Sequence, residues 1–223
     1  MWFNDLFGFG EETPEQVRHI LVLEVTRLRS LVNGRSYSCR TLEVPSLDAL
    51  RKTLSDSDPS EGKLAGREVV ADVQALHLLP ENRDVLFQVA SQFNLLEMVH
   101  PGIALEMGVG RYWLDRTQGP ACAIACGAGT VYRNYFLPVQ GEPGQTAERQ
   151  IDCLQWIGET LRNDELMLRR MQNGYVMSNE AGLMHIAEVL QRMGNAEREH
   201  LKGQLRIGAQ WNAEVTLGAV AIP

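Results

Sequence analysis

The segment from Asp115 to Gly129 constrains this chain most, because it joins a polar loop, a Gly-Pro step and a run of small residues. Proline loses no hydrogen bond at the first position of a helix, so we expect Pro120 to begin a helix with Gly119 as its N-cap. Such a helix start directs backbone N–H groups and the positive end of the helix dipole toward the preceding loop, where an anionic ligand would bind. The alternative is a tightly packed helix start, in which alanine and cysteine are present only for their size.

Composition bounds the class of protein. The chain has 223 residues, of which 44% are hydrophobic, and this is enough for one principal core or a core with a small appendage. The formal net charge of −7 argues against a nucleic-acid partner, although local N–H groups can still bind a phosphorylated small molecule. The four cysteines show neither zinc-ligand spacing nor a disulfide pattern, so we expect no metal, no cofactor and a reducing compartment.

The hydrophobic pattern also bears on location. The first ten residues lack the basic region and the long apolar stretch of a secretory signal, and no apolar run approaches the length of a membrane span. We therefore expect a cytoplasmic protein without a membrane partner. The oligomeric state stays open.

Helical and extended patterns alternate along the chain. Thr13, Pro14 and Glu15 form a helix-start signature, and apolar spacing predicts a helix from there to about Asn33. Further helices are predicted at 46–54, from Pro120 within the loop-and-helix segment 115–127, at 147–161 and at 180–193, the last capped by Ser178. Extended segments are predicted at 35–45, 68–79, 85–90, 131–139, 175–177 and 205–217. Short continuous apolar runs are typical of buried parallel strands, so the pattern predicts an α/β fold with a mixed or mostly parallel sheet.

Three short motifs, in order, resemble the macrodomain family, whose members bind ADP-ribose. They are Val69-Val-Ala-Asp-Val-Gln-Ala-Leu76, then Asp84-Val-Leu-Phe-Gln-Val-Ala-Ser91, and then Gly119-Pro-Ala-Cys-Ala-Ile-Ala-Cys-Gly127. The second resembles the strand and loop of the poly-ADP-ribose glycohydrolase branch, and the third resembles the phosphate loop and the helix behind it. The chain departs from the family in having one glycine in this loop, a longer spacing before it and no recognisable second phosphate loop.

The resemblance implies a three-layer, macrodomain-like mixed sheet flanked by helices over residues 67–223, with residues 1–66 as an N-terminal helical extension packed on this core. It also implies the ligand contacts. Asp72 would accept a hydrogen bond from the adenine amino group, and Ser91 or Asn94 would face the ribose. Gly119 and the amides that follow it, Ala121 included, would hold the diphosphate.

Cleavage of an ADP-ribosyl bond develops positive charge on the ribose and needs a carboxylate that orients water or protonates the leaving group. Glu97 lies in the loop expected to cover the ribose and is the first candidate, and Asp115 is the second. The alternative for Glu97 is a surface acid or a first-turn residue favoured by the helix dipole, and for Asp115 a turn or capping residue. Asn94 is equally suited to a turn.

Other side chains have two interpretations each. Gln118 is either a ligand contact or a solvated helix-start residue, and Tyr132 either stacks on adenine or ribose or packs in the core. Cys122 and Cys126 are interpreted as small packing residues, because no base for them is evident, and His77 has no evident partner.

Three functions are consistent with the sequence. The chain binds ADP-ribose or a related NAD-derived nucleotide and hydrolyses an ADP-ribosyl linkage, or it reads ADP-ribose without turnover, or it is a structural or interaction module with no nucleotide site. The position of the Glu97 carboxylate relative to the ribose site separates the first function from the second.

Overall fold

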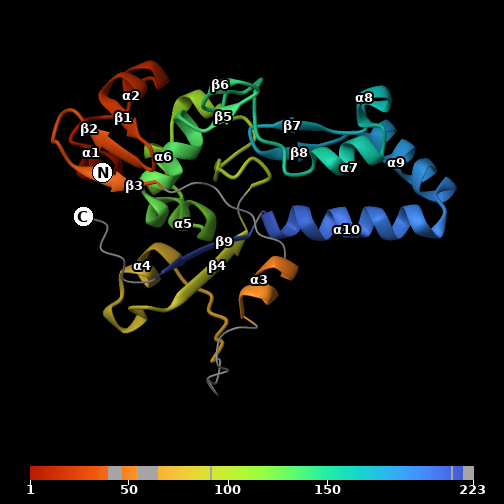
Figure 1. Cartoon of the computed structure of the whole chain (residues 1–223), viewed down its shortest axis with the longest axis horizontal. Helices are drawn as coiled ribbons and strands as arrows, with labels where there is room; N and C mark the ends of the chain where they lie inside the picture. Colours follow the sequence, from red (N-terminus) through yellow and green to blue (C-terminus); the bar gives the residue numbers. More distant parts are fainter. Residues whose placement is uncertain (40–46, 55–64, 91, 212, 218–223) are drawn as a thin grey trace.

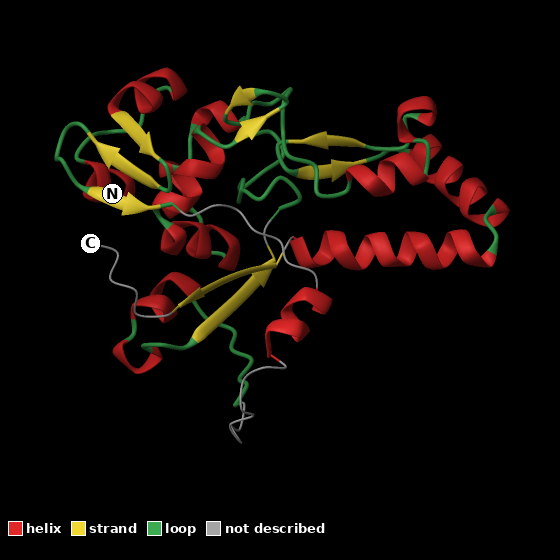
Figure 2. Cartoon of the chain, viewed as in Figure 1, coloured by secondary structure: helices red, strands yellow, loops and turns green. Residues whose placement is uncertain are grey.

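The computed structural model describes residues 1–39, 47–54, 65–90, 92–211 and 213–217 (Figure 1). The described chain is mixed α/β, with helices and small antiparallel sheets (Figure 2). The α-helices are α1 (Trp2–Phe7), α2 (Pro14–Ile20), α3 (Leu47–Leu54), α4 (Val73–Leu78), α5 (Gln118–Cys126), α6 (Ala128–Tyr135), α7 (Gln155–Thr160), α8 (Asn163–Leu166), α9 (Glu180–Arg192) and α10 (Asn195–Trp211). Short 3₁₀ helices are η1 (Pro80–Asn82), η2 (Leu105–Met107) and η3 (Gly110–Leu114).

The strands pair only in antiparallel ladders among the described residues. A three-stranded sheet contains β1 (Leu21–Glu24), β2 (Arg27–Ser30) and β3 (Ser36–Ser38). The other pairs are β4 (Leu86–Ala90) with β9 (Ala213–Leu217), β5 (Pro138–Val139) with β6 (Glu142–Pro143), and β7 (Arg170–Gln172) with β8 (Tyr175–Met177). The parallel pairing expected from the short apolar runs is therefore not found in this part of the chain.

Helix α2 begins where the sequence predicts. Thr13 is the N-cap, its hydroxyl accepts a hydrogen bond from the Gln16 amide at 3.1 Å, and Pro14 is in the first turn. The helix ends at Ile20, however, and the predicted continuation to Asn33 is wrong. Leu28 and Ser30, two residues apart on β2, are both buried, and this spacing of two favours a strand.

The segment 1–66, expected as a helical extension, thus also contains the β1–β2–β3 sheet. This segment contributes to the main core. Trp2, Phe3 and Phe7 of α1 belong to the same hydrophobic cluster as Tyr112 and Val131. The aromatic rings of α1 are packed closely, with Phe3 and Phe7 centroids 5.1 Å apart. The first helix and the middle of the chain therefore share one core.

A half-buried carboxylate also connects the N-terminal segment to the rest of the described chain. Glu11 accepts hydrogen bonds from the amides of Val109, at 3.1 Å, and Gly110, at 2.5 Å, and from the Tyr135 hydroxyl at 2.6 Å. Burial raises the pKa of Glu11 above its ordinary value of 4.5, and the hydrogen bonds from Tyr135 and the two amides offset only part of this rise. The folded chain consequently binds a proton at Glu11 more tightly than the unfolded chain does.

Three predicted strands differ from the structure. The segment 68–79 contains helix α4, and most of 131–139 lies in helix α6, with only Pro138–Val139 extended. The segment 205–217 is divided between the end of α10 and β9. Apolar and β-branched runs are compatible with either structure, and tertiary packing selects the helix over α4, α6 and the end of α10.

Other elements agree with the sequence. Residues 86–90 and 175–177 are strands, 36–38 is the short extended segment, and α3 begins after the predicted cap at residues 45–46, which lie outside the described residues. The predicted helix at 147–161 is confirmed only over Gln155–Thr160. Helix α9 matches its prediction except at the cap: the Asn179 side chain, not Ser178, accepts from the Gly182 amide at 2.8 Å. Figure 1 shows α9 and α10 extending from the rest of the molecule.

The raised pKa of Glu11 predicts a pH dependence of stability. Because the folded state binds the proton more tightly, the contribution of Glu11 to the free energy of unfolding is fully present below pH 4.5 and decreases as the pH rises above it. The difference in free energy of unfolding between wild type and Glu11→Gln should therefore fall between pH 4.5 and neutral pH. Urea denaturation across this range measures it.

The matched control for this measurement is Glu12→Gln, because Glu12 is the exposed neighbour of Glu11. Its difference from wild type should change less with pH than that of Glu11→Gln. A difference for Glu11→Gln that is flat or that grows with pH contradicts the prediction.

Candidate functional site

The start of helix α5 gathers several predicted site residues. The helix begins at Gln118 with Thr117 as its N-cap, two residues earlier than the predicted start at Pro120 with Gly119 as N-cap. Proline is tolerated throughout the first turn, because those backbone N–H groups have no partner within the helix. The Asp115 carboxylate accepts a hydrogen bond from the Thr117 amide at 2.8 Å, which is the turn role that the sequence left open.

Glu97 lies directly against this first turn. Its side chain is buried, with 6% of its surface exposed, and its amide donates a hydrogen bond to the Tyr112 hydroxyl at 3.1 Å. A Cβ atom added at Gly119 would overlap Glu97 Oε2. The structure therefore brings Glu97 and Gly119 together, with a carboxylate at the positive end of the helix dipole. In this conformation the carboxylate fills the space in front of Gly119.

Asp72 joins the same region through an ion pair. Its Oδ2 lies 2.9 Å from Arg116 Nη1, and its Oδ1 accepts from the Ala75 amide at 3.3 Å in the first turn of α4. The Arg116 side chain is 68% exposed, so the ion pair itself adds little stability. It nevertheless shows that Asp72 and the loop before α5 are neighbours.

The candidates for the ribose contact differ in position. Asn94 is fully buried, and it makes internal hydrogen bonds: Nδ2 donates to Gln150 Oε1 at 3.2 Å, and Oδ1 accepts from the Leu96 amide at 3.1 Å. Its carbonyl also accepts from Gln145 Nε2 at 3.0 Å. Asn94 therefore holds the loop together, as the turn interpretation predicts. Ser91 lies outside the described residues.

The remaining predicted contacts lie on α5 or on α6. Ala121 is buried, and its amide donates to the Thr117 carbonyl at 3.4 Å, so this amide is used inside the helix. Gln118 forms the first residue of α5. Tyr132 is on α6, half-buried against the hydrophobic core, and burial raises the pKa of its hydroxyl. Tyr132 therefore packs against the core, which is one of the two interpretations of this residue.

A thiol of α5 and an imidazole of α4 lie in contact, a pair that the sequence did not indicate. Cys122 Sγ lies 3.7 Å from His77 Nε2, and both side chains are buried. The His77 ring stacks on Phe87, with centroids 4.1 Å apart. The expectation that His77 has no partner is therefore wrong. Helical spacing gave no signal, because the two residues come from α4 and α5.

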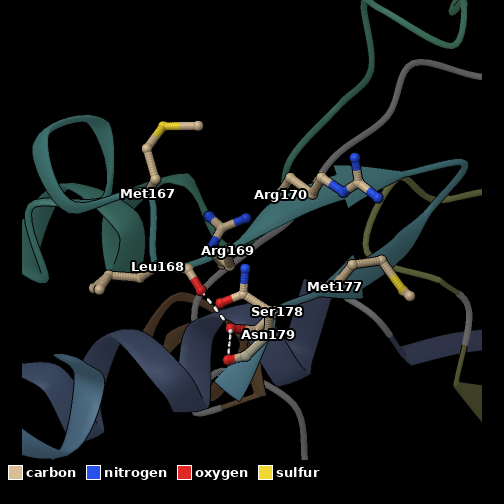
Figure 3. A pocket seen from close by; sticks show the side chains of 7 residues that line it. All are labelled: Met167, Leu168, Arg169, Arg170, Met177, Ser178 and Asn179. Atoms are coloured by element: carbon tan, nitrogen blue, oxygen red, sulfur yellow. Dashed lines mark hydrogen bonds between the residues drawn. The ribbon is translucent and has the colours of Figure 1, made fainter. Parts of the chain in front are cut away.

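Two cavities lie elsewhere in the described chain. One, of about 400 Å³, is lined by the first residue of β7 with the three residues before it, and by the last residue of β8 with the two residues after it (Figure 3): Met167, Leu168, Arg169, Arg170, Met177, Ser178 and Asn179. The Ser178 hydroxyl donates to the Leu168 carbonyl there at 2.5 Å. The other, of about 630 Å³, lies beside α7. Neither cavity is lined by a predicted ADP-ribose contact.

Two features are not found among the described residues. No group of three or more histidine, cysteine, aspartate or glutamate side chains in this part of the chain is arranged to hold a metal ion. Among the same residues, no helix has the length and apolar character needed to cross a membrane.

Comparisons with known proteins add no assignment. No protein-family model, curated protein or solved structure matches this chain.

The contact between Glu97 and Gly119 predicts a steric cost. Gly119→Ala should lower the free energy of unfolding by about 1–3 kcal/mol, because a buried side chain must shift to admit the methyl group. In a Glu97→Ala background the overlap is absent, and the same substitution should cost less. Thermal or urea denaturation of the four proteins in this cycle measures the coupling.

Gly129→Ala is the matched control. Gly129 lies in α6, and an added Cβ would meet no other atom within 4 Å. This variant should retain or slightly raise stability, because alanine favours helix. Equal losses for the two glycine variants, or no coupling to Glu97, contradict the predicted contact.

Proposed function

We propose that this chain binds ADP-ribose or a related NAD-derived nucleotide at the start of α5, and that Glu97 serves in hydrolysis of an ADP-ribosyl linkage. One observation carries the proposal: Asp72, Glu97 and the loop 115–119, which are separate in sequence, meet at one helix start. The macrodomain resemblance of the sequence assigns ligand contacts to these segments. A macrodomain-like three-layer arrangement belongs to the proposal as well, beyond the small sheets described above.

The charge at the site decides how such a ligand would lie. A phosphate in front of Gly119 would meet the Glu97 carboxylate, and two negative groups in contact repel each other. The exposed guanidinium of Arg116 is the better phosphate partner, because it forms paired N–H bonds to phosphate oxygens. Binding would exchange the weak Arg116–Asp72 pair for contacts of Arg116 with phosphate and of Asp72 with adenine.

Glu97 has the chemistry needed at the ribose. Its carboxylate would accept hydrogen bonds from ribose hydroxyls or from a water molecule. As a base it would take a proton from that water during attack on the anomeric carbon, and as a carboxylate it would stabilise the positive charge that develops there. Because Glu97 is buried, less water competes with its carboxylate for the positive charge that develops on the ribose.

A second candidate function is a structural or interaction module. It is favoured by the burial of Gly119, Ala121 and Asn94, which is the arrangement expected if the small residues serve packing alone. A reader of ADP-ribose without turnover needs the binding contacts but no catalytic carboxylate. Binding and turnover measurements separate the three functions.

ADP-ribose binding provides the test. Calorimetry should show saturable binding of ADP-ribose to the wild type, and the ligand should raise the melting temperature. Arg116→Ala should weaken binding about tenfold, through the loss of a charged hydrogen bond to phosphate. Glu97→Gln should retain binding and lower the rate of ADP-ribose release from an ADP-ribosylated substrate by about 100-fold or more.

Arg192→Ala is the control for charge, because Arg192 is exposed on α9, and it should bind as the wild type does. Binding without turnover by the wild type identifies a reader. If neither calorimetry nor the melting temperature detects ADP-ribose, the nucleotide site is rejected and the structural or interaction module is favoured.

A further inference from the structure

The larger cavity, of about 630 Å³, has a lining unlike that of the α5 site. It lies between β5, the segment before α7, the first residues of α8 and the end of α10, on the side of the molecule where α7 and α10 run together (Figure 1). Its volume is in the range of small-ligand sites. No residue assigned to nucleotide binding contributes to it, so it is a separate feature.

Two tryptophans form one wall of this cavity. Trp156 of α7 and Trp211, the last residue of α10, have ring centroids 4.6 Å apart at an interplanar angle of 70°. Trp156 remains 39% exposed although it is the largest apolar side chain of its helix. Indole faces at a cavity attract flat or cationic groups, because the ring face is negative.

The charged groups of the lining are mostly acidic. They are Asp152, Glu159, Asp164 and Arg169, so the lining has a net charge of minus two. The guanidinium of Arg169 is already engaged: it lies 2.8 Å from the Asp152 carboxylate and donates to the Leu154 carbonyl at 2.7 Å. The carboxylates of Glu159 and Asp164 give the cavity its negative potential.

The neutral polar groups of the lining are partly engaged: Gln150 Oε1 accepts from Asn94 Nδ2 at 3.2 Å and from the Gly174 amide at 2.9 Å, and Asn163 Oδ1 accepts from the Arg169 amide at 2.8 Å. Gln140, Gln150, Gln155 and Asn163 present side-chain amides, and Gln155 Nε2 donates to Glu159 Oε1 at 2.9 Å. This bond orients the Glu159 carboxylate without cancelling its charge. A ligand rich in N–H donors can therefore form hydrogen bonds with the Glu159 and Asp164 carboxylates of this lining.

We propose that this cavity binds a guanidinium group, as carried by arginine or an arginine side chain. A guanidinium is planar and stacks on an indole face, and its five N–H donors match carboxylate and amide acceptors. A quaternary ammonium has no N–H donor for these acceptors. A lysine ammonium is compact and strongly hydrated, so it uses the flat aromatic wall less well.

The probes are Nα-acetyl-arginine amide and its neutral isostere Nα-acetyl-citrulline amide, with Nα-acetyl-lysine amide as the second cation. Calorimetry, with tryptophan fluorescence as a second readout, should show binding of the arginine probe and at least tenfold weaker binding of citrulline. The lysine probe should fall between them. Equal binding of arginine and citrulline, or no binding of arginine by either readout, overturns the proposal.

Variants locate the site. Trp156→Ala should weaken the arginine probe about fivefold, from loss of the cation–π contact, and Glu159→Gln should weaken it similarly. Trp113→Ala is the matched control, because Trp113 is 42% exposed but lies on η3, and Glu188→Gln on α9 is the control for charge. Circular dichroism confirms that each variant is folded. Equal weakening by the control variants overturns the assignment to this cavity.

Free arginine and the tripeptide Gly-Arg-Gly distinguish the source of the group. Tighter binding of the tripeptide supports recognition of an arginine side chain in a peptide. Equal or tighter binding of free arginine supports a small-molecule ligand. Both results require a guanidinium site, and neither depends on ADP-ribose binding.

Discussion

The burial of helix α5 is the constraint on which the rest of the structure depends. Gly119 to Ile124 are buried in succession, so the helix has no solvated face over this turn and a half. Only small residues allow neighbours on all sides to approach, and α4, η3, α6, β4 and β9 all pack against it. The same close packing brings Glu97 to Gly119 and His77 to Cys122. The contacts of the candidate site therefore arise from the packing of this helix as well as from its polar side chains.

Local sequence signals predicted the parts of the fold that local physics determines. The Thr13-Pro14 start of α2 and the extent of α9 follow from capping and helical spacing within a few residues. Helix α6 shows where such signals fail. Val131 and Tyr135 favour strands individually, yet they lie four residues apart and both are buried on one helix face. The spacing of four indicates the helix, whereas the residue types favour a strand.

The site was predictable in its segments but not in its contacts. The sequence pointed to residues 72, 97 and 115–119, and the structure brings them together. Nothing in the sequence indicates that Arg116 pairs with Asp72 or that Glu97 fills the space before Gly119. Both contacts form between elements that are distant in the chain. The fully buried Asn94 shows the same limit, since an asparagine that binds ligand and one that holds a loop look alike in sequence.

Net charge separates the two proposed ligands by how each would reach the protein. A chain of formal charge −7 repels a diphosphate at long range and attracts a guanidinium. Salt screens this field beyond about 8–10 Å, so short-range contacts decide the bound state. Anion recognition must then depend on a local cation such as Arg116, whereas the acidic, tryptophan-lined cavity acts in the same direction as the overall field. Added salt should accordingly lower the rate at which a guanidinium ligand associates with the protein.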